Sequence, residues 1–283
     1  MAQRKQPKVL LFDIGGVCVV SPFQAILDYE LSLGIPPGWV NYSISKSAPD
    51  GFWHRLERGE IPLDQAFFDG FNKDLHDPAL WRAFYRGKRP DQTLRELPRL
   101  PAVDGEWLFN EMMSTSHTPD PWMHPALEKL KQSGKYVLAA LSNTIVFPPG
   151  HKLHRADYFA DPVRQLFDIF ISSAHVGLRK PDPRIYQLAV ATLDSFAREN
   201  ADSERGRRSE WGAGIQANDI LFLDDIGENL KGARAQGFDT IKVPLGRTYE
   251  AVEALERVTG MQLEGRHPKI PVRPASAEHK AKM

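Results

Sequence analysis

Three aspartates stand where apolar runs of strand length end. Asp13 closes the run KVLLFD, and the adjacent pair Asp224 and Asp225 closes DILFLDD. Lys180 follows a further run of this kind, in the segment GLRKPDPRIY. The carboxyl ends of parallel strands share one edge of a sheet, which is where open α/β folds bind ligands. We therefore expect the three carboxylates and the lysine to meet in one site.

Carboxylates this close together repel each other, by about 1 kcal/mol at ~4 Å even in water and by more where solvent is excluded. Either some of them are protonated or a cation joins them. Lys180 supplies one positive charge. A hard divalent ion such as Mg2+ is the natural second, because it prefers oxygen ligands and leaves room for a phosphate oxygen. The sequence therefore predicts a Mg2+ site that binds an anion.

Ser142 and Asn143 end another apolar run, YVLAALSN, so we expect them at the same edge as donors to the anion. Gly15 and Gly16 follow Asp13 closely, and glycine lets backbone groups approach a ligand. Taken singly, these segments have plainer interpretations: Asp13 as a turn residue, DDIGEN as a helix start and LSNT as a turn. Their combination favours a site.

Five short apolar runs, bounded by Gly, Pro, Asn or Asp, are typical of strands buried on both faces of a parallel sheet. Helical patterns lie between these runs, as in HPALEKLKQSG, with Pro near its start and Gly at its end. The alternation predicts an α/β fold with a doubly wound, Rossmann-like parallel sheet. The predicted strands are residues 8–13, 136–143, 167–173, 219–225 and 238–244, and the predicted helices are 124–134, 182–197, 228–237 and 248–260.

Residues 21–120 break this alternation, because they contain helical patterns and no convincing strand. We interpret them as a helical cap, inserted after the first strand over the ligand edge of the sheet. The predicted organisation is an α/β core of residues 1–20 and 121–265, the cap of residues 21–120, and a flexible tail of residues 266–283. The polar segment 198–218 is expected to be a surface loop.

The charge and cysteine content narrow the class of protein. Lys+Arg and Asp+Glu both number 36, so nothing in the composition indicates nucleic acid or an anionic membrane as a partner. No stretch approaches the ~20 apolar residues of a membrane span. The single cysteine, Cys18, excludes an internal disulfide and favours a reducing compartment. We therefore expect an intracellular, cytoplasmic protein, and the sequence carries no signal of its oligomeric state.

The last three residues, Ala-Lys-Met, resemble a relaxed form of the peroxisomal Ser-Lys-Leu ending. A basic residue, Lys280, stands just upstream of them. An untargeted tail is the alternative, and it is the interpretation we favour.

The regions FDIGGV, LSNT, GLRKPDPRIY and LDDIGENLKGARAQG occur in this order, and in combination they resemble the haloacid dehalogenase-like (HAD-like) hydrolase superfamily. GEIPLDQAF, and the stretch from LDDIGENLKGARAQGFDTIKV to LERVTGMQL, are similar to the amino-terminal phosphatase domain of soluble epoxide hydrolases. The resemblance covers residues 8–263 apart from 198–218. It implies a capped α/β core and a hydrolase with an aspartate as covalent nucleophile.

The resemblance implies a role for each acidic residue. Asp13 would attack phosphorus and form an aspartyl-phosphate, which water then hydrolyses. Asp13, Asp225 and the Gly15 carbonyl would bind Mg2+, and Asp224 would arrange that ligand shell.

The remaining motif residues would handle the phosphate. Lys180 would neutralise the charge that develops during transfer. Ser142, Asn143 and the backbone at Gly16 would hold phosphate oxygens. The implied catalytic set is Asp13, Lys180 and Ser142, and the implied partner is a small phosphorylated molecule.

Position 15 departs from the phosphatase pattern of this family, which has a second aspartate there as general acid; this chain has Gly15. General acid catalysis contributes about 10²–10⁴-fold, and it matters most for poor leaving groups such as alkyl alcohols. We therefore expect a Mg2+-dependent phosphatase that hydrolyses a small phosphate monoester slowly or over a restricted range, unless a cap residue or water supplies the proton. Acyl, sugar 1- and aryl phosphates would suffer least.

Two other functions remain open. A metal-independent haloacid dehalogenase would use the same aspartate to displace halide; Gly15 favours it slightly, and the pair Asp224–Asp225 counts against it. A non-catalytic member that only binds a phosphate ligand is the other alternative. Epoxide hydrolysis is not expected, because in the resembled proteins it belongs to a second domain.

Overall fold

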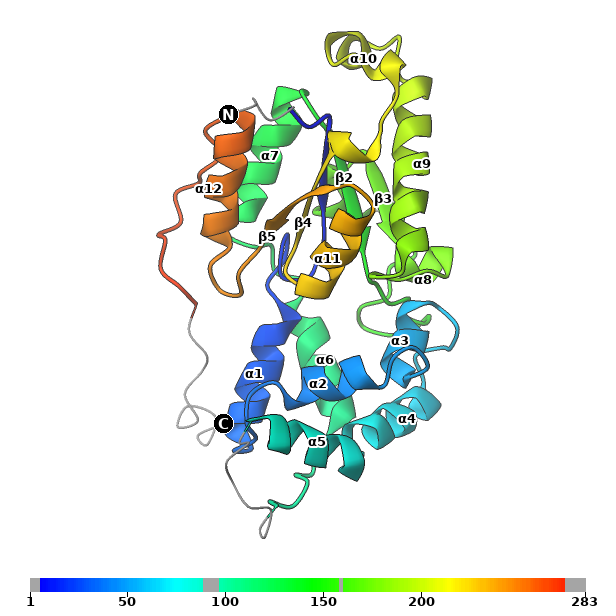
Figure 1. The fold of residues 1–283 in the computed structure, drawn as a ribbon, viewed down its shortest axis with the longest axis vertical. Coiled ribbons are helices and arrows are strands. Elements are labelled where there is room, and N and C mark those ends of the chain that lie inside the picture. The colour runs from blue at the N-terminus through cyan, green and yellow to red at the C-terminus, as the bar shows by residue number, and fades with distance from the viewer. Residues whose placement is uncertain (1–5, 89–96, 158–159, 273–283) are drawn as a thin grey trace.

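The computed structural model of the chain describes residues 6–88, 97–157 and 160–272. Five parallel strands form one sheet in the order β3-β2-β1-β4-β5 (Figure 1). All five predicted strands are present, and the fold is the expected doubly wound α/β sheet with an inserted helical cap. The strands are β1 Val9–Phe12, β2 Val137–Ser142, β3 Ile169–Ser172, β4 Ile220–Asp224 and β5 Asp239–Lys242.

Both faces of the sheet are buried, because alternate residues of the inner strands enter different hydrophobic clusters. In β1, Leu10 and Phe12 pack with helices α7 (Met123–Ser133) and α12 (Thr248–Thr259), whereas Val9 and Leu11 pack with α9 (Pro183–Glu199) and α11 (Gly227–Ala235). Two helical layers therefore enclose the sheet (Figure 1). The helices of this core are α7 Met123–Ser133, α8 Ser173–Val176, α9 Pro183–Glu199, α10 Glu204–Arg208, α11 Gly227–Ala235 and α12 Thr248–Thr259, with 3-10 turns at Arg164–Leu166, Trp211–Ala213 and Ala217–Asp219.

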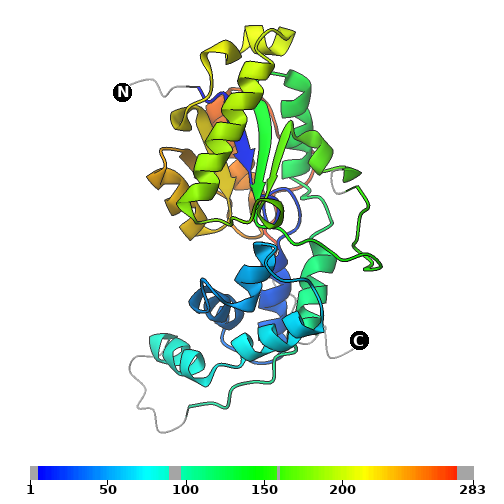
Figure 2. The same cartoon turned by 90° about the vertical axis from the view of Figure 1, so that its right-hand side faces the viewer.

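The cap consists of helices α1 to α6 of the described residues, which lie between β1 and α7, and it lies at the carboxyl edge of the sheet (Figures 1 and 2). It has a hydrophobic cluster of its own, rich in buried aromatic rings. The stretches WRAFY and GFWHRL contribute Trp81, Phe84 and Leu56 to that cluster, so they serve mainly as cap core. The cap helices are α1 Pro22–Ser32, α2 Trp39–Lys46, α3 Phe52–Glu57, α4 Gln65–Leu75, α5 Pro78–Lys88 and α6 Gly105–Thr115.

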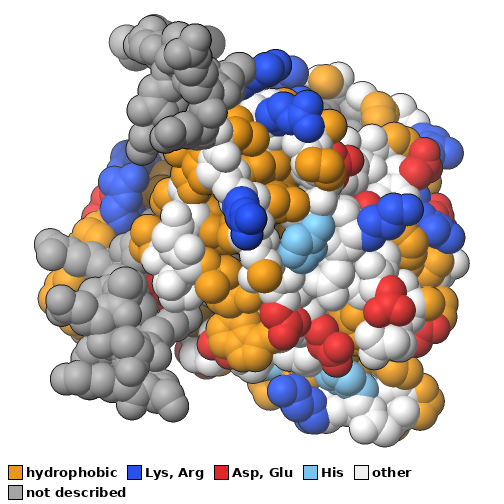
Figure 3. Space-filling model, turned by 90° about the horizontal axis from the view of Figure 1, so that it is seen from below, with side chains coloured by type: hydrophobic (Ala, Val, Ile, Leu, Met, Phe, Trp, Pro, Cys, Tyr) orange, Lys and Arg blue, Asp and Glu red, His pale blue; other side chains and the backbone are white. Residues whose placement is uncertain are grey.

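The chain enters and leaves the cap through two segments that lie side by side. Val20 N donates to Thr118 O at 2.8 Å, and Val19 pairs with Pro119 in an antiparallel bridge. Helices α1 and α6 then pack against each other as they run into the cap (Figure 2). At the far end of the cap, charged side chains of both signs surround a group of hydrophobic ones (Figure 3), and Leu33 and Trp107 are exposed.

Two stretches differ from the sequence expectations. Residues 198–218 were expected to form a surface loop, but this segment contains α10 and buries Trp211 and Ile215 against α9 and the sheet. The segment is polar on average, so the sequence pattern did not indicate that these two apolar residues would be buried. In the segment after 265, Trp122 Nε1 donates to Pro268 O at 3.2 Å and Val272 N donates to Gly246 O at 2.9 Å, so residues 266–272 contact the core. The Ala-Lys-Met ending lies outside the described residues.

The described residues contain no helix that is both long and apolar enough to cross a membrane.

Asp168, just before β3, joins several elements of the core. Its carboxylate accepts hydrogen bonds from Leu138 N (3.0 Å), Lys131 Nζ (3.0 Å) and the Arg205 guanidinium (2.9 Å). Burial alone would raise the pKa of Asp168, but the hydrogen bonds from Arg205, Leu138 and Lys131 outweigh it and hold the pKa below the usual 3.8. The charged form of this carboxyl therefore stabilises the fold.

We predict that Asp168→Asn lowers the free energy of unfolding by about 2 kcal/mol at pH 7, because hydrogen bonds to a charged partner are lost. A lowered pKa contributes stability above the unfolded-state value of 3.8, and this contribution disappears as the pH falls through the folded-state pKa. Urea unfolding at several pH values should show the wild type and the variant converging below pH 4. The exposed Glu199→Gln is the control, with a change of less than about 0.5 kcal/mol; a gap that stays constant with pH would contradict the assignment.

Candidate active site

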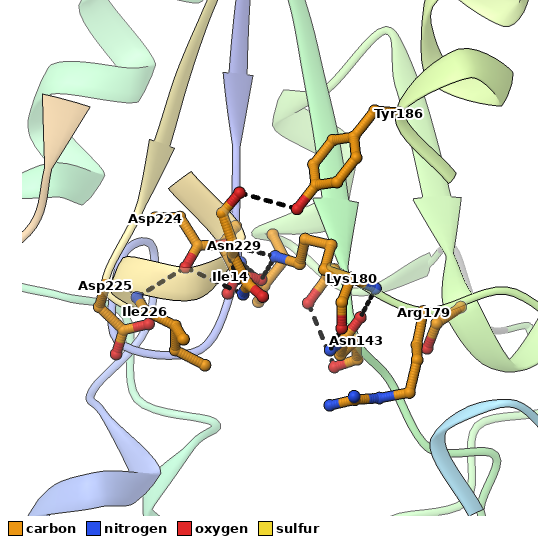
Figure 4. A network of polar contacts seen from close by, with 12 residues as sticks. Ile14, Asn143, Arg179, Lys180, Tyr186, Asp224, Asp225, Ile226 and Asn229 are labelled. Atoms are coloured by element: carbon orange, nitrogen blue, oxygen red, sulfur yellow. Dashed lines mark hydrogen bonds and ion pairs between the residues drawn. The ribbon is translucent and has the colours of Figure 1, made fainter. Parts of the chain in front are cut away.

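The three aspartates meet at the carboxyl edge of the sheet, as predicted. Asp13 follows β1, Asp224 ends β4 and Asp225 follows it, and β1 and β4 are neighbours. One carboxylate oxygen of each lies within 4.8 Å of the others. Lys180, in the loop before α9, enters the same cluster (Figure 4).

Lys180 is a fully buried cation between two of these carboxylates. Its Nζ lies 3.0 Å from Asp13 Oδ1 and 2.7 Å from Asp224 Oδ2. Its ammonium also lies 5.2 Å from the centre of the Phe222 ring. Burial alone would lower the pKa of Lys180, but the charges of Asp13 and Asp224 raise it above its usual value. Lys180 is therefore a permanent positive charge in the site.

Asp224 is fully buried and has partners on both oxygens. Its Oδ1 accepts from Ile226 N at 2.7 Å, and Asn229 Nδ2 lies 3.1 Å from each oxygen. The Asn229 carbonyl in turn accepts from the hydroxyl of Tyr186 at 2.8 Å (Figure 4). Asp224 therefore fixes Lys180 and the turn into α11.

Asp13 and Asp225 line the space above the sheet, in surroundings that make their charged forms costly without a nearby cation. Burial raises the pKa of Asp13 to about 6; Lys180 opposes this rise and Asp224 adds to it. Burial, followed by the charges of Asp13 and Asp224, raises the pKa of Asp225 well above its usual value. Asp225 Oδ2 is also buried without a hydrogen-bond partner among the described residues. Burying a carboxylate oxygen without a partner is costly, so we expect a cation to bind there.

The donor set suits a hard divalent ion. Three carboxyl groups face one ammonium, so the cluster would carry an excess of negative charge with all three ionised, and its oxygen without a partner among the described residues belongs to Asp225. Mg2+ takes carboxylate, carbonyl and water oxygens. Asp13, Asp225 and Gly15 all line the same cavity. Asp224 is not part of this lining, and both of its oxygens already have hydrogen-bond or ion-pair partners.

Gly16 makes room for Asp225. Its φ is +74°, and an added Cβ would collide with Oδ2 of Asp225 and approach Ser21 Oγ. Its N–H, which we expected to hold a phosphate oxygen, donates to Val19 O at 3.1 Å in this turn. At Gly15, by contrast, the nearest atom to an added Cβ would be Pro22 Cδ at 3.6 Å.

Ser142 and Asn143 hold the other residues of the site in place. Ser142 is buried and its Oγ donates to Asn143 O at 3.4 Å; its hydroxyl also opposes the rise in the pKa of Asp13 that burial causes. The Asn143 amide bonds twice to the backbone of Lys180: Oδ1 accepts from its N–H at 2.8 Å, and Nδ2 donates to its carbonyl at 3.2 Å (Figure 4). Asn143 therefore positions the lysine loop, and one N–H of its amide remains for a ligand.

A cavity of about 540 Å³ separates this cluster from the cap. The core side presents Asp13, Gly15, Asn143 and Asp225. Most of the cap side is apolar, but one end is polar. The apolar lining includes Phe23, Ile26, Ile44, Trp53 and Met112, and the polar end is formed by His54 and Glu57 of α3 together with Arg179 of the core.

Sequence reasoning missed the residues at that polar end, and it also missed the serines that connect the core to this part of the cap. Ser173, which begins α8, accepts from Thr144 N at 2.8 Å and donates to the carbonyl of Glu57 at 2.5 Å. Thr144 Oγ1 and Ser172 Oγ also share a 2.5 Å hydrogen bond. The two serines of FDIFISS thus connect the LSNT segment to the cap. Their position at the end of an apolar run was the available signal.

The chain thus combines a parallel α/β core, a helical cap and a buried aspartate that lies beside a buried lysine. Residues 7–237 match the family described as haloacid dehalogenase-like hydrolase. The chain therefore belongs to this family, and it is a hydrolase.

Curated relatives include two large enzymes and one phosphatase. The chain is 27% identical to acyl-CoA dehydrogenase family member 10 of Mus musculus over 90% of its own length and 19% of the relative. It is 29% identical to bifunctional epoxide hydrolase 2 of Sus scrofa over 90% of its own length and 39% of that protein. It is 29% identical to sesquiterpene phosphatase AstK of Aspergillus oryzae over 56% and 68% of the two lengths. The chain thus spans well under half the length of the first two relatives.

We predict opposite outcomes for alanine at the two neighbouring glycines. Gly16→Ala should lower the free energy of unfolding by at least about 1–2 kcal/mol, because a positive φ strains any other residue and because the new methyl group displaces Asp225. Gly15→Ala should leave it unchanged or raise it by up to about 1 kcal/mol. Chemical denaturation measures both. Equal effects of the two substitutions would contradict the crowding at Gly16.

Proposed function

We propose that the chain is a Mg2+-dependent phosphatase that hydrolyses a small phosphate monoester through an aspartyl-phosphate on Asp13. The observation that carries this proposal is the buried cluster in which Lys180 holds Asp13 while Asp225 keeps an unpartnered oxygen. A haloacid dehalogenase needs the nucleophile and the lysine but no second acidic ligand. The excess of carboxylates therefore favours the metal-dependent reaction.

Asp13 is the nucleophile in this mechanism. Its Oδ1 is held by Lys180 Nζ and by Ile14 N at 2.7 Å, so the carboxylate has a fixed orientation at the floor of the cavity. A bond forms between a carboxylate oxygen and phosphorus while the bond from phosphorus to the leaving group breaks. Water then attacks phosphorus, which frees Asp13 and releases inorganic phosphate.

The other residues assist in defined ways. Mg2+, bound by Asp13, Asp225 and the Gly15 carbonyl, would neutralise phosphate charge and orient the group for in-line transfer. Lys180 compensates charge on Asp13 during attack, and Asp224 keeps Lys180 in place. We expect Ser142 and the remaining amide N–H of Asn143 to donate hydrogen bonds to phosphate oxygens.

The cap selects the substrate in this proposal. We take residues 21–120 as the cap and residues 1–20 with 121–265 as the core, because the cap helices carry a separate hydrophobic cluster. The apolar lining of the cavity supports an ester with an apolar part, and the similarity to a sesquiterpene phosphatase points the same way. Without an acid at Gly15, esters with good leaving groups react fastest.

We predict that the protein hydrolyses p-nitrophenyl phosphate with Mg2+ present, that EDTA abolishes the reaction, and that excess Mg2+ restores it. Asp13→Asn should reduce kcat by at least about 10³-fold, because the nucleophile is lost. The rate of nitrophenol release is compared between the wild type and the variant, after circular dichroism has shown that both are folded. Halide release from 2-chloropropionate that survives EDTA would instead identify a dehalogenase, and phosphate binding without turnover would identify a binding protein.

We also predict that Mg2+ raises the thermal unfolding temperature of the wild type, since a ligand that binds only the folded state stabilises it, by about 2.7 kcal/mol at 100 times its dissociation constant. Asp225→Asn should remove this response without lowering the stability of the metal-free protein, because one buried like charge disappears. Glu228→Gln, at the exposed rim of the same cavity, is the matched control and should respond as the wild type does. A full Mg2+ response in Asp225→Asn would contradict the assignment of this ligand.

A further inference from the structure

The lack of an acid at Gly15 raises the question of what stabilises the departing oxygen, and an answer rests on the proposed phosphatase function. In-line attack by Asp13 expels the leaving group away from the sheet. Asp13 lies at the core side of the cavity, so the leaving group departs toward the cap. The groups that line the cavity there are therefore the ones that meet the developing negative charge.

Arg179 is the one arginine or lysine among the described residues that line this cavity. Its Nε donates to Glu57 Oε2 at 2.8 Å, and Nη2 lies 2.8 Å from the same oxygen. Nη1 has no hydrogen-bond partner within the described part of the chain and keeps two N–H groups. In Figure 4 the guanidinium extends beneath Asn143, on the cap side of the polar network.

Both ends of the Arg179 side chain are fixed. The backbone of the adjacent Lys180 is clamped by Asn143. The guanidinium is held by Glu57, whose own carbonyl accepts from Ser173. The side chains of Arg179 and Glu57 are only 18% and 10% exposed. A charged donor that is already oriented before reaction can stabilise developing charge without reorganising.

The other ionisable groups at this end of the cavity are poorer candidates. Burial, followed by the charges of Arg179 and Arg58, lowers the pKa of His54 to about 4, so His54 has no extra proton to give at neutral pH. Glu57 is the acceptor in its ion pair with Arg179. Glu228 lies on the core side and is exposed to water.

We propose that Arg179 contacts the leaving-group oxygen and that Glu57 positions it for this contact. As the phosphorus–oxygen bond breaks, the electron pair stays on the leaving oxygen, and Nη1 donates hydrogen bonds to that oxyanion. Arg179 remains protonated throughout, and the released oxyanion takes its proton from water. The site therefore selects monoesters of acidic hydroxyl groups, such as aryl or enol phosphates, for which stabilisation by hydrogen bonds replaces proton transfer.

A leaving-group series tests this role with Mg2+ present. Arg179→Met should lower kcat/KM for phenyl phosphate by about 100-fold, the typical cost of one lost oxyanion donor, and for p-nitrophenyl phosphate by less than about 10-fold. The dependence of kcat/KM on the pKa of the leaving group becomes steeper. Arg179→Lys should recover part of the phenyl phosphate activity, and Glu57→Gln should show the same bias to a smaller degree. Arg184→Met, at an arginine whose side chain is 71% exposed, should change neither rate.

Two results would overturn the inference while leaving the phosphatase intact. One is an equal loss in Arg179→Met for both esters, which is what damage to the fold or to phosphate binding would give. The other is a leaving-group bias in His54→Gln or Glu228→Gln that is absent from both Arg179 variants. If the wild type turns over neither ester, the phosphatase function fails, and the role of Arg179 fails with it.

Discussion

The ion pairs of Lys180 hold the site together. One fully buried ammonium lies within 3.0 Å of Asp13 and 2.7 Å of Asp224, and removing either partner from such a cluster would leave a charge in an apolar interior. Asn143 holds the backbone of this lysine and Asn229 holds Asp224, so Asp13 is oriented by residues from distant parts of the chain. A single cation does not balance three carboxylates, and this imbalance is the physical reason to expect a divalent ion.

Much of the core of this site could be predicted from the sequence. The apolar runs that end in Asp13, Ser142 and Asp224 carry a local signal, and parallel strands bring their ends to one edge. The order β2-β1-β4, which makes these ends neighbours, was not readable, because it depends on pairings between segments more than eighty residues apart. Likewise the resemblance suggested phosphate contacts for Asn143 and Gly16, but it could not show that Asn143 clamps the lysine loop or that Gly16 makes room for Asp225.

The cap side of the cavity was beyond sequence reasoning for a related reason. His54 and Glu57 carry no motif, and Arg179 lies in the GLRKPDPRIY region without a role of its own there. The three become neighbours only when α3 docks on the loops after β2 and β3. Segment 198–218 was misjudged for a different reason. Its polar residues outnumber Trp211 and Ile215, although the burial of these two residues determines where the segment packs. In both places the packing depends on a few contacts of individual residues, which the average composition of a segment does not indicate.

The most direct measurement is mass spectrometry of the protein quenched in acid during turnover of an aryl phosphate with Mg2+. We predict a phosphoryl group on the peptide that contains Asp13, present in the wild type and absent from Asp13→Asn. Hydrolysis of the ester without a phosphoryl group on that peptide, or with the group on another residue, would contradict the assignment of Asp13 as the residue that the buried lysine prepares for attack.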